Sequence, residues 1–487
     1  MARWCARAGA AVTVADTREA PPQLAALRNE MPTARFVHCE LDAALVESMA
    51  IDHVLKSPGL SPASVAPLLI ATKDRSISTG SELSLFSRAL ADLKADRGYD
   101  PAVVAITGTN GKTTVTALTG QLVERAGKTV AVAGNIGPTL LDTLTERIEQ
   151  GTLPQVWVIE LSSFQLDATG LGGGLEPTAA TVLNISQDHL DWHGDMQAYA
   201  AAKAQVFGAR GLMVLNRDDP QVMRMLPPAV KGKPERLFTT FGGDMPERPG
   251  DFGIEDVNGM AWLVRALEAD ETRKPRRGGA HAAQDIHIQR LMPADALRIR
   301  GRHNAVNALA GLALASAVGC ALGPMLYGLR DYRGEPHRVE AVGLINGVEY
   351  FDDSKGTNVG ATVAALIGLG TERRLVVILG GDGKGQDFAP LAAPVACYAR
   401  AVVLIGRDGP RIAEALAGTA VPLLEAPSMT EAVKLASARA HAGDAVLMSP
   451  ACASFDMFEN YGHRARVFRE AVAELASEAG VELEGSA

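Results

Sequence analysis

The chain has 487 residues, 47% of them hydrophobic, and the usual domain size of about 150 residues predicts roughly three domains. Its net charge of −9 argues against a nucleic-acid-binding surface over the whole protein. No apolar run approaches the roughly 18 residues of a membrane-spanning helix, and the five scattered cysteines fit neither a disulfide framework nor a zinc site, so we expect a cytoplasmic protein with no membrane partner.

The N-terminal stretch has the pattern of half a dinucleotide-binding unit. A short helix over 1–8 precedes an apolar strand over 11–15, which ends at Asp16-Thr17-Arg18, where a carboxylate can accept hydrogen bonds from a nucleotide. The strand and Gly-rich turn expected ahead of the first helix are missing, which predicts a truncated Rossmann-like unit. A signal peptide is the alternative, although its apolar run is short.

Short strands and helices alternate from 35 to 57, and Pro58 and Gly59 then enforce a turn. Ser57 at this turn either contacts a ligand or caps the turn. A helical pattern over 81–98 ends at Asp96-Arg97-Gly98. We therefore place the first domain boundary near residue 98.

The stretch over 103–115 predicts a phosphate-binding loop. An apolar strand, 103–106, leads through glycines into a helix that opens with Lys112. Glycines let backbone N–H groups approach an anion, the helix N-terminus and Lys112 add positive charge, and a Thr hydroxyl suits Mg²⁺. The strict G-x-x-x-x-G-K spacing fails because Ile106 replaces its first glycine, and a turn that only caps a helix is the alternative. The loop comprises Gly108, Thr109, Asn110, Gly111, Lys112, Thr113 and Thr114.

Three further apolar strands, over 130–133, 156–159 and 180–183, end in polar residues. They predict a parallel α/β sheet whose ligands collect at its carboxyl edge, where Glu160 and His189 would join Lys112. A carboxylate after a buried strand is costly unless it is paired or bound to a cation, which favours a Mg²⁺ role for Glu160 over a salt bridge.

The rest of the central region is less informative. Lys203 lies in a helical run over 198–207, and its local pattern alone indicates a lysine on a solvated face. Residues 268–285 are charged and small and predict a mobile surface insertion. Asn304 and Asn307 share a face at the start of a long helix, 305–318, as capping groups or ligand contacts.

Strands that alternate with helices after the Gly-Pro linker at 334–338 predict a second doubly wound α/β sheet. Its strands again end in polar residues. Three of these, Lys355, Lys384 and Ser454, could converge on an anionic small molecule, although each alone would be an ordinary surface residue.

Together these motifs resemble the Mur ligases, the ATP-dependent amide-forming enzymes of peptidoglycan synthesis, over nearly the whole chain. The loop at 108–114 resembles the phosphate loop that Mur ligases share with folylpolyglutamate synthases. The segments Glu160 to Leu166, Asp353 to Asn358 and Ser449 to Ser454 resemble the branch of the family that adds D-glutamate. The insertion at 268–285 is longer than the family needs.

The resemblance implies an α/β protein of three domains. Residues 1–98 would bind a UDP-sugar, although their first strand and Gly-rich loop are missing; residues 99–333 would be a P-loop ATPase with a parallel sheet; and residues 334–487 would be a Rossmann-like amino-acid domain. The expected enzyme is a monomeric, cytoplasmic, Mg²⁺-dependent ligase of cell wall biogenesis and cell division. It would join D-glutamate to UDP-N-acetylmuramoyl-L-alanine through an acyl phosphate.

The alternatives are another Mur ligase, a folylpolyglutamate synthase-like ligase, or a truncated inactive binding protein. An acceptor assay and a binding measurement separate them.

The resemblance also implies individual roles, including a carbamylated lysine at position 203 that replaces the solvated-face interpretation. Catalysis would rest on Lys112, Glu160, His189 and Lys203, and Mg²⁺ on Thr113, Glu160, His189 and Lys203. ATP would contact the loop from Gly108 to Thr114 together with Asn304, Asn307, Arg338 and Asp353. The two other substrates would contact Asp16, Thr17, Arg18, Ser57, Asn135, Ser162, Gln165, Thr357, Lys384, Ser454 and Tyr461.

Overall fold

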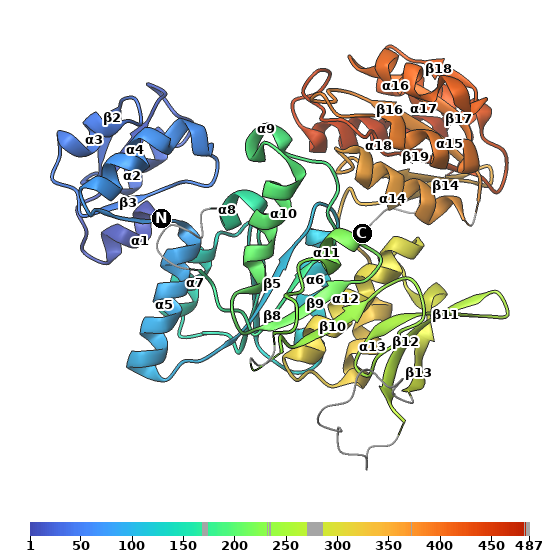
Figure 1. Cartoon of the computed structure of the whole chain (residues 1–487). Helices are drawn as coiled ribbons and strands as arrows, with labels where there is room; N and C mark the ends of the chain where they lie inside the picture. The colour runs from blue at the N-terminus through green and yellow to red at the C-terminus, as the bar shows by residue number, and fades with distance from the viewer. Residues whose placement is uncertain are drawn as a thin grey trace.

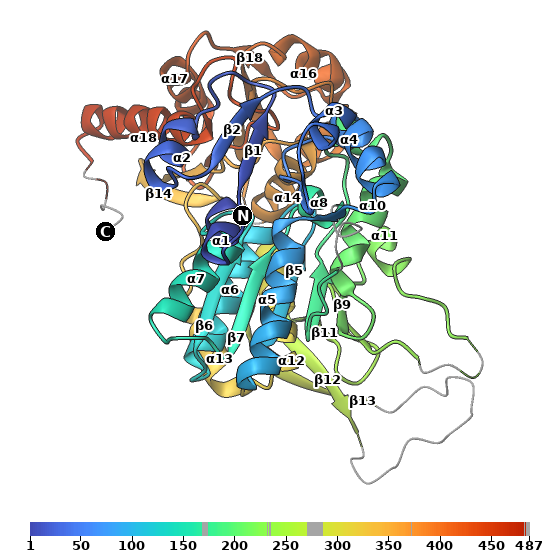
Figure 2. The same cartoon turned by 90° about the vertical axis from the view of Figure 1, so that its left-hand side faces the viewer.

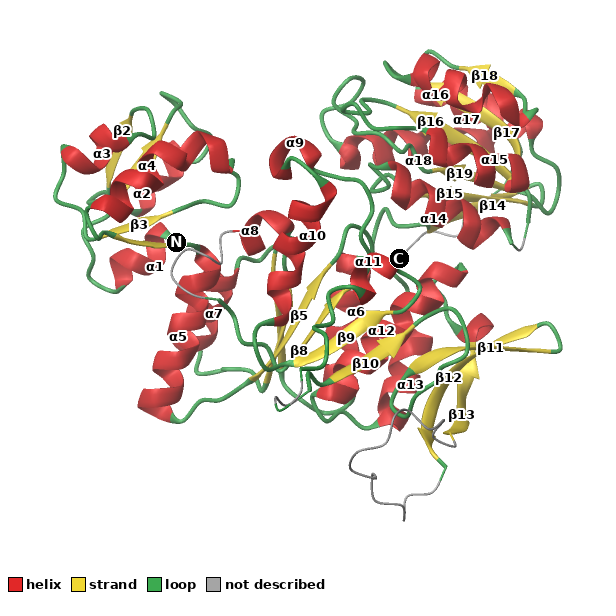
Figure 3. Cartoon of the chain, viewed as in Figure 1, coloured by secondary structure: helices red, strands yellow, loops and turns green. Residues whose placement is uncertain are grey.

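The computed structural model describes residues 1–167, 174–230, 232, 235–269, 286–371, 373–481 and 483. Within these ranges the strands form a nine-stranded sheet, a six-stranded sheet and two two-stranded sheets (Figure 1). Helices pack around the strands, as the colouring in Figure 3 shows. None of the described helices is both long enough and apolar enough to cross a membrane.

The N-terminal part contains the two small sheets, both parallel, around a small core that includes Val46, Val65 and Leu68. The predicted first helix and the strand that ends at Asp16 are confirmed. The strands are β1 (Thr13–Asp16), β2 (Arg35–His38), β3 (His53–Leu55) and β4 (Ser78–Gly80). The helices are α1 (Ala2–Arg7), α2 (Leu24–Glu30), α3 (Ala43–Glu47) and α4 (Pro62–Asp74).

Helix α5 (Glu82–Arg97) connects this part to the central sheet. A reciprocal capping box between Ser81 and Ser84 begins it, and Gly98, with φ of 66°, ends it. Its Leu83 and Phe86 are buried in the core of the central sheet. Packing therefore continues across the predicted boundary at residue 98, and Figure 2 shows α5 lying in front of the central strands.

The nine-stranded sheet has the order β13-β12-β11-β10-β9-β8-β5-β7-β6. Its strands run parallel from β6 to β11, and β12 and β13 complete an antiparallel meander. The sequence predicted β5 to β8, each end within about one residue, but not β10 to β13. Residues 270–285 of the expected insertion, between β12 and β13, lie outside the described residues. The strands are β5 (Ala102–Thr107), β6 (Val130–Gly134), β7 (Val156–Glu160), β8 (Ala179–Val182), β9 (Leu212–Asn216), β10 (Phe238–Phe241), β11 (Phe252–Val257), β12 (Met260–Glu268) and β13 (Ile286–Pro293).

Two hydrophobic clusters cover the two faces of this sheet. Leu118 of α6 and Leu309 of α12 are buried in one cluster, and Leu144 of α7 and Tyr199 of α10 are buried in the other. Because apolar packing covers both faces, a polar site is expected at the carboxyl edge of the parallel strands. The helices are α6 (Lys112–Arg125), α7 (Leu140–Glu149), α8 (Ser163–Asp167), α9 (Leu190–His193), α10 (Met196–Ala204), η2 (Gln205–Phe207), α11 (Pro220–Met223), η3 (Ala294–Ala296), α12 (Arg302–Ala317) and α13 (Leu322–Asp331).

The C-terminal part is built on the six-stranded sheet, with the order β14-β15-β19-β16-β17-β18. Only the edge strand β14 is antiparallel, and helices cover both faces, which confirms the expected parallel-dominant α/β architecture. The strands are β14 (Glu340–Ile345), β15 (Val348–Asp352), β16 (Leu375–Gly380), β17 (Ala399–Ile405), β18 (Leu423–Glu425) and β19 (Ala445–Met448). The helices are α14 (Val359–Gly370), η4 (Ala389–Leu391), α15 (Ala392–Tyr398), α16 (Gly409–Leu416), η5 (Ala417–Thr419), α17 (Met429–Arg439) and α18 (Tyr461–Glu478).

Candidate active site

The loop between β5 and α6 has the geometry of an anion cradle. Gly108 and Gly111 adopt φ of 153° and 80°, a region that other residues rarely occupy. A Cβ at Gly111 would lie 2.9 Å from the Asn307 side-chain oxygen, so only glycine fits there. Asn184, two residues after the end of β8, fixes the loop because its carbonyl and side-chain oxygens accept hydrogen bonds from the backbone N–H groups of Thr109 and Asn110.

The Lys112 side chain folds back over this loop. Its Nζ donates hydrogen bonds of 2.8 Å to the carbonyl oxygens of both Gly108 and Thr109. Burial lowers the pKa of Lys112, and the nearby Glu160 carboxylate opposes that shift. A cation held over a glycine-containing loop at the N-terminus of a helix is suited to a bound phosphate.

Glu160, the last residue of β7, is 3% exposed. Its Oε1 accepts a hydrogen bond from Asn135 Nδ2 at 3.0 Å, and its Oε2, also buried, has no hydrogen-bond partner among the described residues. A buried carboxylate oxygen without a partner is costly, and a divalent cation with an oxygen preference would satisfy it. Glu160 therefore fits the predicted Mg²⁺ role.

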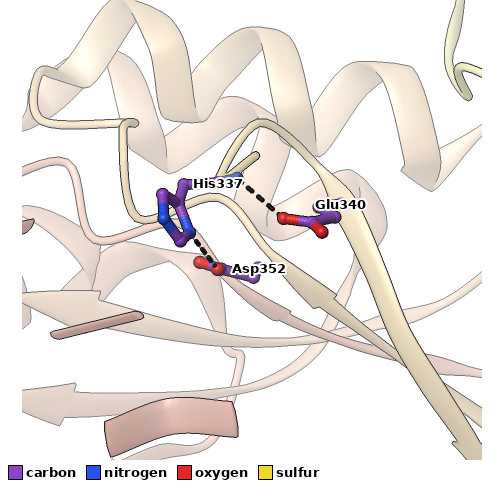
Figure 4. A group of neighbouring side chains, drawn as sticks. All are labelled: His337, Glu340 and Asp352. Carbon is purple, nitrogen blue, oxygen red and sulfur yellow. Dashed lines mark hydrogen bonds and ion pairs between the residues drawn. The ribbon is translucent and has the colours of Figure 1, made fainter. Parts of the chain in front are cut away.

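His189 lies at the N-cap of α9 with φ of 53°. Its ring contacts Phe164 edge-on with centroids 4.6 Å apart, and its Nε2 lies 3.6 Å from the Asp188 carboxylate. The only cluster of three His, Cys, Asp or Glu ligand atoms within 4.8 Å of one another, among the described residues, is His337, Glu340 and Asp352 (Figure 4). Only two of the predicted magnesium ligands, Glu160 and His189, are of these residue types, so they could not form such a group of three, and Mg²⁺ commonly completes its coordination with water and substrate phosphates.

The His337 cluster lies elsewhere, at the start of the C-terminal part. His337 Nδ1 and Asp352 Oδ2 are 2.8 Å apart, and the His337 backbone N–H donates to Glu340 (Figure 4). Arg469 forms ion pairs with both carboxylates. Because Arg469 and His337 already engage the two carboxylates, we interpret this cluster as a structural network.

The structure contradicts the solvated-face position that the local sequence pattern indicated for Lys203. The side chain is 1% exposed and not on a solvated face. Its Nζ donates to the Gly108 carbonyl at 2.9 Å and lies 4.8 Å from the centre of the Tyr199 ring. Desolvation, reinforced by the charge of Lys112, moves the pKa of Lys203 well below its usual value. The Ala-rich helix α10 conceals this burial because alanines show no contrast between its faces.

The two predicted asparagines of α12 lie beneath the phosphate loop. Asn304 Nδ2 donates to the Arg300 carbonyl at 2.8 Å, and Asn307 Nδ2 donates to Asn304 Oδ1 at 3.1 Å. The sequence left open whether these asparagines cap the helix or contact a ligand. The N-cap residue of α12 is Gly301, so neither asparagine occupies the N-cap position. The pair is positioned by internal hydrogen bonds beside Gly111.

The C-terminal part reaches the same loop. Arg338 donates a hydrogen bond to the Thr113 hydroxyl. Asp353 accepts hydrogen bonds from the Ser449 hydroxyl at 2.6 Å and from the Val339 backbone N–H at 3.3 Å. Burial, partly opposed by the Ser449 hydrogen bond, raises the pKa of Asp353 to about 7. The structure thus brings Arg338 to the helix that follows the phosphate loop and buries Asp353 among residues of the C-terminal part.

The predicted amino-acid contacts occupy two neighbouring places. Asp382 and Ala453 pair through two backbone hydrogen bonds, which bring the loop of Lys384 beside that of Ser454. Tyr461, at the start of α18, lies under Lys355 Nζ, 3.9 Å from the ring centre. Thr357 lies in the turn that follows Lys355.

The remaining predicted contacts are locally engaged. Arg18 donates two side-chain hydrogen bonds and its backbone N–H to the Asp16 carboxylate, and these hold the pKa of Asp16 at about 2. Gln165 Oε1 accepts hydrogen bonds from the backbone and hydroxyl of Ser162. The Thr17 carbonyl lies 3.1 Å from His38 Nε2, and Ser57 is exposed.

Sequence reasoning missed several residues that shape the site. Tyr199 is one helical turn before Lys203, and its hydroxyl lies 3.1 Å from Thr109 Oγ1. Lys56, beside Ser57, is buried with its Nζ 5.4 Å from the centre of the Trp192 ring. The i, i+4 spacing could have indicated Tyr199, whereas Lys56 meets Trp192 only through tertiary packing.

Two family models match the chain: the Mur ligase middle domain over residues 106–315, and the Mur ligase, glutamate ligase domain over residues 337–452. The UDP-N-acetylmuramoylalanine–D-glutamate ligase of Albidiferax ferrireducens is 69% identical, and the alignment covers 100% of this chain and 96% of that relative. The fold is similar to that of UDP-N-acetylmuramate-alanine ligase MurC from Thermotoga maritima, with a TM-score of 0.54, 20% identity, and coverage of 97% and 96% of the two chains. It is also similar to MurF ligase from Thermotoga maritima in complex with ADP, with a TM-score of 0.55, 14% identity, and coverage of 90% and 98%.

Proposed function

The chain belongs to the Mur ligase family and is an ATP-dependent, amide-bond-forming ligase, and we propose that it joins D-glutamate to UDP-N-acetylmuramoyl-L-alanine. The observation that carries the proposal is the carboxyl edge of the central sheet, where Lys112, Lys203 and the unpartnered oxygen of Glu160 meet the phosphate loop. The acceptor is inferred from the full-length relative of that name.

The proposed reaction has two steps. The L-alanyl carboxylate attacks the γ-phosphorus of ATP and releases ADP, which leaves an acyl phosphate. The amine of D-glutamate then attacks the acyl carbon, and the tetrahedral intermediate expels phosphate as the amine loses a proton to His189 or to a nearby carboxylate. Lys112 and the backbone N–H groups of the loop stabilise the charge on the transferred phosphoryl group.

We propose Thr113, Glu160, His189 and a carbamylated Lys203 as the residues that hold Mg²⁺, which when bound would neutralise phosphate charge. Glu160 and Lys203 are buried side by side with Lys112, and a carbamate on Lys203 would supply a second anion next to Glu160. The two anions and the Thr113 hydroxyl are oxygen donors, which this cation prefers.

We further propose the domain division 1–98, 99–333 and 334–487, for the UDP-sugar, ATP and the amino acid in turn. The boundary near residue 334 is supported because the hydrophobic clusters of the nine-stranded sheet are separate from those of the six-stranded sheet. Helix α5 joins the first two domains because it packs on the central core.

The acceptor assay tests the function directly. We expect the purified chain, supplied with ATP, Mg²⁺ and UDP-N-acetylmuramoyl-L-alanine, to release phosphate with D-glutamate and not with L-glutamate, L-alanine or meso-diaminopimelate. Turnover with another acceptor would assign a different ligase activity. The absence of turnover with all four, together with retained binding of the UDP-sugar, would favour a binding protein.

We expect Glu160→Gln to raise the Mg²⁺ concentration for half-maximal phosphate release at least roughly tenfold, because the amide cannot supply an anionic ligand. Glutamine has nearly the same shape as glutamate, so the variant should keep the fold. Glu124→Gln, at an exposed position of α6, is the matched control. An unchanged Mg²⁺ dependence in Glu160→Gln would remove Glu160 from the metal site.

A further inference from the structure

Helix α14 of the C-terminal part begins directly on the phosphate loop of the central part. Its N-cap residue, Asn358, is 7% exposed. The Asn358 Oδ1 accepts a hydrogen bond of 2.8 Å from the Ala361 backbone N–H, which caps the helix. Its Nδ2 points the other way and donates to Asn110 Oδ1 at 3.2 Å and to Asp188 Oδ2 at 3.4 Å. One amide therefore caps α14 and contacts two loops of the central part.

The backbone of α14 approaches the same place. A Cβ at Gly360 would lie 2.7 Å from Ser186 Oγ and 3.2 Å from Asn110 Nδ2. These two central residues also hydrogen bond to each other, at 3.4 Å. The absence of a side chain at Gly360 thus allows the first turn of α14 to rest on the phosphate loop.

The other end of α14 docks on the central part as well. Gly368 has no room for a Cβ because the buried His303 ring of α12 occupies that space. Glycines at both ends of the helix therefore permit close contact with central residues, which identifies α14 as the docking element of the C-terminal part.

We propose that Asn358 is a positioning residue that couples the phosphate loop to the amino-acid side of the active site. It follows Thr357 directly in the chain, and its two partners are the loop residue Asn110 and the neighbour of His189. The amide sets the separation between the bound phosphates and the loop that precedes α14. This inference rests on the proposed function, because coupling matters only if the amine attacks a group activated on the phosphate loop.

Asn358→Ser is the sharpest test. Serine is as good an N-cap as asparagine, so α14 should remain formed, but the two hydrogen bonds to the central part are lost. We expect kcat with D-glutamate to fall roughly tenfold and the affinity for ATP alone to change less than about twofold. D-glutamate and the UDP-substrate should tighten the binding of a non-hydrolysable ATP analogue in the wild type, and this enhancement should shrink in the variant. Asn358→Asp also keeps the cap but faces the Asp188 carboxylate, so its loss should be larger.

Gly360→Ala tests the same contact without changing any polar group. The added methyl meets Ser186, whereas alanine favours the helix, so kcat should fall while the melting temperature does not. Gly323→Ala on α13, where a Cβ meets nothing within 4 Å, is the matched control. Small-angle scattering should show compaction of the wild type with all substrates and less compaction of both variants.

The outcomes separate the two proposals. A wild-type chain without D-glutamate-dependent phosphate release would refute the proposed function. An active wild type whose Asn358→Ser and Gly360→Ala variants match it in kcat and in ATP coupling would refute the positioning role of Asn358 alone. A variant that loses activity only because its melting temperature drops would also refute that role.

Discussion

Lys112→Ala lowers ATP-dependent phosphate release by at least roughly a thousandfold and leaves the fold intact. Phosphoryl transfer is catalysed mainly by positioning and by charge stabilisation, and Lys112 supplies the full positive charge closest to the loop carbonyls of Gly108 and Thr109. Loop geometry should survive, because the two glycines and Asn184 set it independently of the lysine. A phosphate-release assay and a thermal melt measure the two effects.

Two controls sharpen this result. Lys94→Ala removes an exposed lysine of α5, whose ion pair with Asp100 lies on the surface, and should leave the rate unchanged. Lys112→Arg keeps the charge but replaces a compact ammonium with a broad planar group, so it should not restore the rate fully. Near-normal activity in Lys112→Ala would contradict the phosphate-loop assignment.

The elements that sequence reasoning found are those with a local signature. Strands β5, β7 and β8 are buried on both faces and therefore read as continuous apolar runs. Gly98 and Gly127, with φ of 66° and 84°, lie just past the ends of α5 and α6, where a left-handed residue belongs. Polar residues directly after such strands predicted the sheet edge at which Glu160 and the phosphate loop lie.

The elements that it missed depend on tertiary packing. Strand β13 has a single buried position, and a long polar segment separates it from the short apolar run over 260–264 of β12, so no local pattern pairs the two strands. The local pattern of Lys203 indicated exposure wrongly because its hydrogen bonds are with the end of β5 and the phosphate loop, neither of which is adjacent in sequence.

The same reasoning explains the polar contacts between parts of the chain. The hydrogen bonds of Asn358 to Asn110 and Asp188 join residues separated by 248 and 170 positions, which no local pattern can indicate. The Asp16 carboxylate, which the sequence placed at a strand end where it can accept hydrogen bonds from a nucleotide, also accepts them from a neighbour two residues away, Arg18. A strand-end position predicts where a side chain lies but not which partner it selects.

Lys203→Ala should lower phosphate release at least roughly a hundredfold, and the wild-type rate should depend on bicarbonate. Burial moves the pKa of Lys203 well below its usual value, so more of its amine is neutral at a given pH than in an exposed lysine, and a neutral amine attacks the carbon of CO₂ and loses a proton to form a carbamate. Bicarbonate activation should therefore appear at a lower pH than an exposed lysine would need. Lys203→Arg keeps a cation but cannot be carbamylated, so it should be as inactive as the alanine variant.

Electrostatics favours this modification over an unmodified lysine. As ammonium groups, Lys112 and Lys203 would both donate to the Gly108 carbonyl and repel each other in a buried site, while Glu160 keeps an oxygen without a partner. A carbamate on Lys203 turns one cation into an anion beside Glu160, which removes the repulsion and creates a pair of oxygen ligands for a divalent cation. The carbamate can be measured by ¹³C NMR with labelled bicarbonate. Its signal should be present in the wild type and absent in Lys203→Arg. Full activity of the wild type without bicarbonate and CO₂ would contradict the carbamate.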